Sequence, residues 1–253
     1  MQFLLKSMAT VIAFIMSISQ VLAADVTLYV TRHGKTMFNT AQRVQGWSDT
    51  PLTQPGIDVA EQLGRGLKGI DFISAYSSDL GRARETARVV LAAKGDQLNI
   101  IEMPGLRETC FGDFEGDLDP NMWNPAANYL GYPTDKALMQ AFADRKIGLD
   151  KMLDAIKAVE KSGQAENYAT VRDRMLTSLR TIAKQAQAQG GGNVLVVSHG
   201  LAILSMINEL VDEPLPPGLH NASITKIRYT DEDKFIVETI NDTSYIDKGK
   251  LEQ

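Results

Sequence analysis

The sequence predicts an α/β fold in three layers, with a mainly parallel β-sheet flanked by helices and a small helical cap inserted in mid-chain. Strand-like apolar runs alternate with segments whose apolar residues recur every three or four positions. Two of these runs, residues 26–30 and 194–197, lead into a His-Gly pair. The length of 253 residues fits one large domain that carries a substantial insertion.

The alternation begins in the first part of the chain. Residues 25–31 are expected to form a strand, and the polar residues 34–53 are expected to form a loop. Thr53 with the following Gln-Pro-Gly predicts the start of a helix, because apolar residues then recur at helical spacing up to Leu67.

Two further strands are expected at residues 72–76 and 99–103. Between them lies a segment with an apolar stripe that is typical of a helix on a sheet. The run Ser77-Ser78-Asp79 precedes this helix and is expected to cap it, since short polar side chains accept the first free backbone N–H groups.

Residues 117–165 interrupt the alternation. Their first part, up to residue 133, is rich in proline and asparagine and is expected to be irregular. Helices are expected at 135–142 and 149–159. We interpret this insertion as a cap beside the site. The alternative is a surface elaboration with no role in substrate choice.

The alternation resumes in the last third. A long amphipathic helix is expected to begin at Tyr168 and to end at the three glycines 190–192. The remaining expected elements are a buried strand at 193–197, a helix at 202–211, and an antiparallel pair of strands at 223–229 and 235–240.

Residues 1–23 have the composition of an export signal. Lys6 supplies the positive charge, an apolar run follows, and small residues end it at Ala23. We therefore expect a mature domain of residues 24–253 that is periplasmic or secreted. The alternative is an uncleaved anchor, although a spanning helix needs about 20 apolar residues and this run is shorter.

Overall composition excludes several partners. The formal net charge of −5 favours neither nucleic acid nor an anionic membrane surface, and no stable membrane span is expected in the mature form. Cys110 is the single cysteine, so no disulfide within the chain is possible and we expect a small buried apolar residue there. The sequence leaves the oligomeric state open.

Two histidines occupy matching frames, Thr31-Arg32-His33-Gly34 and Ser198-His199-Gly200. Each follows a predicted strand, and open α/β sheets place their chemistry at the carboxyl ends of strands. We therefore expect both imidazoles in one pocket. Arg32 beside the first histidine indicates an anionic substrate, and phosphate is the commonest anion of this kind.

Four motifs resemble the signatures of the histidine phosphatase superfamily, in its phosphoglycerate mutase-like branch, and they occur in the same order. The first is Arg32-His33-Gly34-Lys35-Thr36, followed by Asn39 and by Gln45-Gly46. The other three are Ser78-Asp79-Leu80-Gly81-Arg82-Ala83, Leu106-Arg107-Glu108 and Ser198-His199-Gly200. The resemblance spans residues 25–241 and implies the same three-layer fold.

The resemblance also implies roles for individual residues. His33 would be the nucleophile and form a phosphohistidine, and His199 would donate to the phosphate. Arg32 and Arg82 would bind the phosphate and keep His33 neutral. Glu108 would be the proton donor. The implied substrate-binding residues are Asn39, Gln45 and Gly46. For the histidines and Glu108, the alternative is an ordinary capping, core or surface residue.

No metal or cofactor is expected. The histidines have no partner at helical metal-ligand spacing. Asp113, Asp117 and Asp119 form an acidic stretch that is expected to be solvated. In the insertion, Trp123, Tyr129, Tyr132 and Phe142 are candidate contacts for an apolar or sugar-like group, although packing is the commoner role of such residues.

The combined interpretation is an exported, metal-independent phosphomonoesterase that forms a phosphohistidine on His33. Its expected substrate is a small phosphorylated molecule or a phosphorylated envelope glycolipid. Mutase-like phosphoryl transfer is one alternative, but the Arg-Arg pair of the mutases is missing from 117–165, where Arg145 is the single arginine. A non-catalytic protein that binds a phosphorylated ligand on the same fold is the other alternative.

Overall fold

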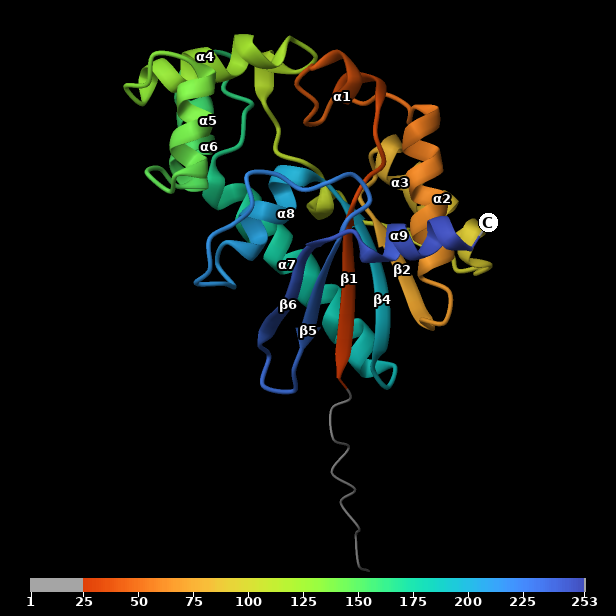
Figure 1. Cartoon of the computed structure of the whole chain (residues 1–253). Helices are drawn as coiled ribbons and strands as arrows, with labels where there is room; N and C mark the ends of the chain where they lie inside the picture. The colour runs from red at the N-terminus through yellow and green to blue at the C-terminus, as the bar shows by residue number, and fades with distance from the viewer. Residues whose placement is uncertain (1–24, 253) are drawn as a thin grey trace, which may run out of the picture.

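The structure is a computed structural model that describes residues 25–252, so the predicted export segment 1–23 lies outside the described residues. A six-stranded sheet with the order β3-β2-β4-β1-β5-β6 forms its centre (Figure 1). The strands are β1 (Val26–Arg32), β2 (Phe72–Ser77), β3 (Ile100–Glu102), β4 (Gly192–Ser198), β5 (Ile224–Tyr229) and β6 (Phe235–Asp242). The first four are mutually parallel, whereas β5 pairs antiparallel with β1 and with β6. The three-layer, mainly parallel fold is thereby confirmed.

Helices cover both faces of the sheet. On one face, α7 (Tyr168–Ala188) and α8 (Gly200–Ile207) pack on a core that includes Leu28, Val30 and Val196. On the other face, α2 (Gln54–Gly66), α3 (Gly81–Lys94) and α9 (Ser244–Leu251) pack on a core that includes Tyr29 and Leu195. Neighbouring residues of β1 and β4 point to opposite faces, so these strands are buried on both sides.

The insertion forms three helices beyond the carboxyl ends of the parallel strands, α4 (Asp119–Tyr129), α5 (Asp135–Ala143) and α6 (Leu149–Val159) (Figure 1). The expectation of an irregular segment up to residue 133 was wrong, because α4 occupies most of it. Pro120 lies in the first turn of α4, where a proline costs no hydrogen bond. Pro125 is tolerated inside this helix, which buries Met122 and two alanines against the neighbouring helices.

Other differences concern helix limits. A short helix, α1 (Met37–Ala41), lies within the expected loop 34–53, with a capping box between Thr36 and Asn39. Helix α8 begins two residues earlier and ends four residues earlier than expected. Helix α9 was not predicted. Two 3₁₀ turns, Pro104–Leu106 and Gly112–Phe114, complete the described elements. Within residues 25–252, no helix combines the length and the apolar composition needed to cross a bilayer.

The expected cap of α3 is not formed in the way the sequence indicated. The N-cap residue is Leu80, which makes no side-chain capping bond. The Ser78 hydroxyl lies 2.7 Å from Nε2 of His199 instead. Ser78 therefore contacts the site, whereas Asp79 of the same run pairs with Arg107.

Candidate active site

The strand register brings the two histidines together. Arg32 at the end of β1 pairs with Ser198 at the end of β4, so the next residue of each strand, His33 and His199, leaves the sheet at the same level. The His33 N–H donates to the Ser198 carbonyl at 3.0 Å, which extends the ladder by one bond. The ring centroids of the two imidazoles are 5.1 Å apart. Two residues separated by most of the chain are thus neighbours at one edge of the sheet.

The surroundings of His33 determine both its tautomer and its charge. Nδ1 lies 2.8 Å from the Gly34 carbonyl, which can only accept, so Nδ1 carries the proton and Nε2 keeps a free lone pair. Burial lowers the pKa of His33 well below 6.5, and the charges of Arg82 and Arg32 lower it further. A neutral imidazole with Nε2 unprotonated is the form that can attack phosphorus.

Glycine at position 34 permits this geometry. A side chain there would place its Cβ 2.5 Å from the Gly56 carbonyl oxygen at the start of α2. The Gly34 N–H donates to the Thr86 hydroxyl, which donates in turn to the Arg82 carbonyl. The loop after β1 is therefore tied to α3, the helix that carries Arg82.

His199 is fully buried and its ring is oriented by Ser78. The Ser78 oxygen accepts the Leu80 N–H at 3.4 Å and lies 2.7 Å from Nε2 of His199. With the hydroxyl proton directed to Nε2, Nδ1 is the protonated nitrogen, and Nδ1 has no partner among the described residues. Burial lowers the pKa of His199 well below 6.5, and Arg82 lowers it further.

Arg82 is fully buried in a cradle formed by the loop after α1. Its terminal nitrogens donate to the carbonyls of Gln45, Gly46 and Ser48 and to the Asp49 carboxylate, at 2.7 to 3.3 Å. Nε of Arg82 has no partner among the described residues, and neither has Nε of Arg32. Buried donors that lack acceptors are costly, and a bound phosphate beside the imidazoles would satisfy them.

Glu108 joins this site to the start of α8. Its carboxylate accepts the backbone N–H groups of Leu201 and Ala202, at 3.0 and 2.7 Å, and that of Thr109 at 2.9 Å. The first two are the second and third residues of the helix, so Glu108 supplies the cap that His199 does not. The same carboxyl group lines the cavity, where it can exchange a proton with a bound ester.

The three residues expected to bind substrate have different positions. Asn39 and Gln45 line the cavity. Asn39 also accepts the Thr36 N–H, and Gln45 bonds the Thr36 and Thr50 hydroxyls. Gly46 is not part of the cavity wall. It contributes a carbonyl to Arg82, and a Cβ there would lie 2.2 Å from the Thr109 carbonyl oxygen.

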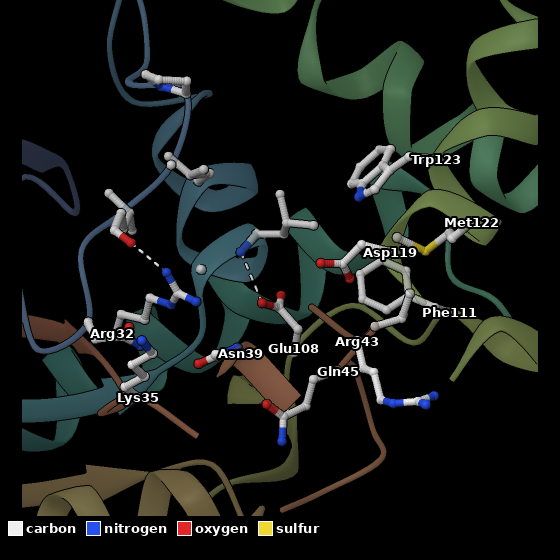
Figure 2. A pocket seen from close by; sticks show the side chains of 18 residues that line it. Arg32, Lys35, Asn39, Arg43, Gln45, Glu108, Phe111, Asp119, Met122 and Trp123 are labelled. Atoms are coloured by element: carbon white, nitrogen blue, oxygen red, sulfur yellow. Dashed lines mark hydrogen bonds between the residues drawn. The ribbon is translucent and has the colours of Figure 1, made fainter. Parts of the chain in front are cut away.

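The cavity beside Arg32 and Glu108 has a volume of about 420 Å³. The side chains of His33, His199 and Arg82 are buried and are not part of its wall. Figure 2 shows Arg32 and Lys35 on one side of it, and Asp119, Met122 and Trp123 on the other. Asp119 therefore lies in the cavity wall, which corrects the expectation of a merely solvated acidic stretch. Of the four aromatic residues expected near the substrate, Trp123 alone lines this cavity.

The other three aromatic residues of the cap have different surroundings. Tyr129 is 64% exposed, whereas Tyr132 and Phe142 pack on the small core between the cap helices.

Several supporting residues were not identified from the sequence. Asn221 donates to the His33 carbonyl at 2.9 Å. Arg174 on α7 donates to the Glu108 carbonyl and pairs with Glu166. Glu115 accepts four backbone N–H groups, three of them from the loop that forms the Arg82 cradle.

Residues 28–243 match the family described as the histidine phosphatase superfamily (branch 1), and the chain belongs to that superfamily. A phosphoglycerate mutase structure from Bacillus anthracis str. Sterne is 42% identical, with a TM-score of 0.85, and the match covers 91% of this chain and 99% of that one. The probable phosphoglycerate mutase GpmB of Escherichia fergusonii is 28% identical, over 89% of this chain and 97% of its own.

Phosphatases are also similar to this chain. A mutant phosphoserine phosphatase from Entamoeba histolytica, solved with phosphoserine, is 25% identical with a TM-score of 0.63, over 87% of this chain and 98% of that one. Superfamily membership and these relatives support phosphoryl transfer through a histidine, by a phosphatase or a mutase-like enzyme.

Within residues 25–252, no group of three or more His, Cys, Asp or Glu side chains is placed to hold a metal ion. Cys110 is buried, and burial raises the pKa of its thiol. The polar groups that remain available beside His33 are hydrogen-bond donors, which suit an anion.

Proposed function

We propose that this protein is an exported phosphomonoesterase that works without a metal ion and forms a phosphohistidine on His33. The assignment as a hydrolase rests on the composition of the cavity wall on the side of the cap. Phe111, Met122, Trp123 and Asp119 lie on this side, together with Arg43, whose guanidinium donates to the Gly116 carbonyl. A mutase must hold a second anionic group of its substrate, and an apolar wall with a carboxylate disfavours one.

In the first step, the Nε2 lone pair of His33 attacks phosphorus while the ester P–O bond breaks. The donors of Arg32, Arg82 and His199 hold the other phosphoryl oxygens and stabilise their charge in the transition state. Glu108 transfers a proton to the departing oxygen, so the product leaves as a neutral alcohol.

In the second step, water attacks the phosphohistidine and the P–N bond breaks. Glu108 is then ionised and takes a proton from the water. Inorganic phosphate leaves, and both His33 and Glu108 return to their starting forms. No group in this sequence of steps requires a metal.

Hydrolysis of an aryl phosphate by the purified protein in excess EDTA tests the proposal. We expect turnover without added divalent ions. Activity that disappears in EDTA and returns only with a divalent ion would refute the metal-independent mechanism. Inorganic phosphate release distinguishes hydrolysis from transfer to a second acceptor.

A mutase is the second candidate, because the relatives described above include proteins named as phosphoglycerate mutases. The test is isomerisation of 3-phosphoglycerate in the presence of a bisphosphorylated primer. We expect phosphate release to exceed any isomerisation. Isomerisation faster than phosphate release would favour the mutase.

Export is supported by the composition of residues 1–23. We expect cell fractionation to recover the protein outside the cytoplasm, with a new N-terminus close to Ala23. An uncleaved chain in the membrane fraction would favour an anchor instead.

A cavity of about 420 Å³ favours a small phosphate ester over a glycolipid.

A further inference from the structure

The cavity beside Arg32 and Glu108 has two unlike ends, and the residues of its cap end take no part in the proposed catalytic steps. Figure 2 shows Glu108 between the arginine side and a group formed by Phe111, Asp119 and Trp123. In the proposed mechanism the phosphate binds at the first end, so the alcohol part of the ester extends toward the second. Its chemistry therefore defines the leaving group.

Asp119 and Arg43 are the charged residues of that end. The Asp119 carboxylate makes no side-chain hydrogen bond or ion pair with another described residue. The Arg43 guanidinium donates to the Gly116 carbonyl at 2.7 Å and points away from Asp119 in Figure 2. Burial raises the pKa of Asp119, and no cation counteracts this.

Aromatic and apolar side chains surround this carboxylate. Trp123 and the buried Phe111 line the same wall, together with Met122. Aromatic faces attract cations, with tryptophan the strongest of them. A carboxylate beside aromatic rings is complementary to an amine on a short carbon chain, and it repels an anion.

We propose that the preferred substrate is a phosphate ester of an amino alcohol, with its ammonium group between Asp119 and Trp123. This inference rests on the proposed phosphatase function and specifies its substrate class. Asp119 is then a specificity-determining residue that contacts the leaving group. It is not a group that reacts.

Asp119 has a competing structural role, because an acidic residue in the first turn of α4 also stabilises the helix. Asp135 provides the matched control. It is the acidic residue in the first turn of the neighbouring cap helix α5, it is also partly exposed, and it does not line the cavity. Comparing Asp119→Asn with Asp135→Asn separates the two roles.

The test compares kcat/KM for 2-aminoethyl phosphate and propyl phosphate, which differ in an ammonium in place of a methyl group. We expect the parent protein to prefer the amine by about tenfold. Asp119→Asn should remove most of this preference, and Asp135→Asn should retain it. We expect 3-phosphoglycerate to be poorer than propyl phosphate.

Equal turnover of the two esters by the parent, or an undiminished preference in folded Asp119→Asn, would overturn the inference. Calorimetric binding of both esters to the His33→Ala variant makes the outcome independent of turnover. Selective binding of the amine, with no hydrolysis of any ester by the parent, would contradict the proposed phosphatase function but support the ammonium subsite. Hydrolysis of aryl phosphate without selective amine binding would support the phosphatase function and contradict the subsite.

Discussion

Two hydrogen bonds determine which nitrogen of each active-site imidazole faces the phosphate. The Gly34 carbonyl holds the proton of His33 on Nδ1, and Ser78 holds Nε2 of His199. His33 therefore presents a lone pair, whereas His199 presents an N–H. Two residues of the same type acquire opposite roles because their neighbours differ.

Glu108→Gln tests the proton donor at the residue scale. The amide cannot transfer a proton, so we expect alkyl phosphate hydrolysis to fall by about 10² to 10⁴-fold. Aryl phosphates should lose much less, since a good leaving group needs little protonation. Steady-state kinetics on both ester types provides the comparison. Equal losses would remove Glu108 from the acid role.

The same variant has a structural effect that must be measured beside its kinetics. Glu108 accepts the Leu201 and Ala202 N–H groups with separate oxygens, and glutamine offers only one acceptor. We expect the free energy of unfolding to fall by about 1 kcal/mol. Denaturant unfolding at the assay temperature establishes whether the variant is folded when its activity is read.

The reacting residues could be predicted from the sequence, but their supports could not. His33, Arg82, Glu108 and His199 lie in motifs that are recognisable on their own. Asn221 and Arg174 act from a late loop and from α7, at positions where asparagine and arginine are ordinary surface residues. The hydrogen bonds of Asn221 and Arg174 to the His33 and Glu108 carbonyls become visible only in the folded structure.

At the scale of elements, the edge of the sheet positions the reacting residues, whereas the cap forms part of the cavity wall. The parallel strands deliver His33 and His199, and α3 delivers Arg82. The cap contributes part of the cavity wall, through α4, and none of the reacting groups. Substrate choice can therefore change without a change in the chemistry.

Trp123→Ala, with Tyr129→Ala as its control, tests this division. Both residues are aromatic and both lie on α4, but only Trp123 lines the cavity, whereas Tyr129 is 64% exposed. We expect Trp123→Ala to raise KM for the preferred ester more than it lowers kcat, because lost contacts to a remote part of a substrate are separable from the reacting centre.

Tyr129→Ala should behave like the parent in the same assay. A loss in Trp123→Ala that is confined to kcat and equal for all esters, in a folded protein, would mean that α4 helps to build the catalytic centre. The cap would then not be a separate specificity element.

Elements with strong periodicity were predictable, and those governed by tertiary packing were not. Helix α7 keeps its apolar spacing over 21 residues and was predicted to begin at the correct residue. Helix α4 was missed because Pro120 and Pro125 indicate irregular chain, yet the buried side of the helix outweighs them. Helix α9 is short, and it is held by close packing on α2, where Gly66 and Gly249 approach each other.

For the whole molecule, the two buried histidines link stability to pH. Their pKa values are lowered well below 6.5 in the folded state, so the unfolded chain binds these protons first as the pH falls. The stabilisation is complete above pH 6.5 and decreases below it. Each histidine contributes a slope of up to about 1.4 kcal/mol per pH unit.

Urea unfolding between about pH 6.5 and 5 measures this slope. His33→Asn should reduce the slope, whereas His220→Asn, which replaces the exposed third histidine, should leave it as in the parent. The Glu160 carboxyl does not contribute to the slope in this range, since its pKa is about 2. An identical slope in parent and His33→Asn would show that His33 is not held neutral.

The central claim is that the phosphoryl group passes through His33 to water. The purified protein is mixed with aryl phosphate, quenched in base within one turnover, and digested for mass spectrometry. We predict a single phosphorylated peptide that contains His33, and its decay to inorganic phosphate at the rate of turnover. Phosphate on another residue, or turnover with no phosphoenzyme at any quench time, would contradict the account.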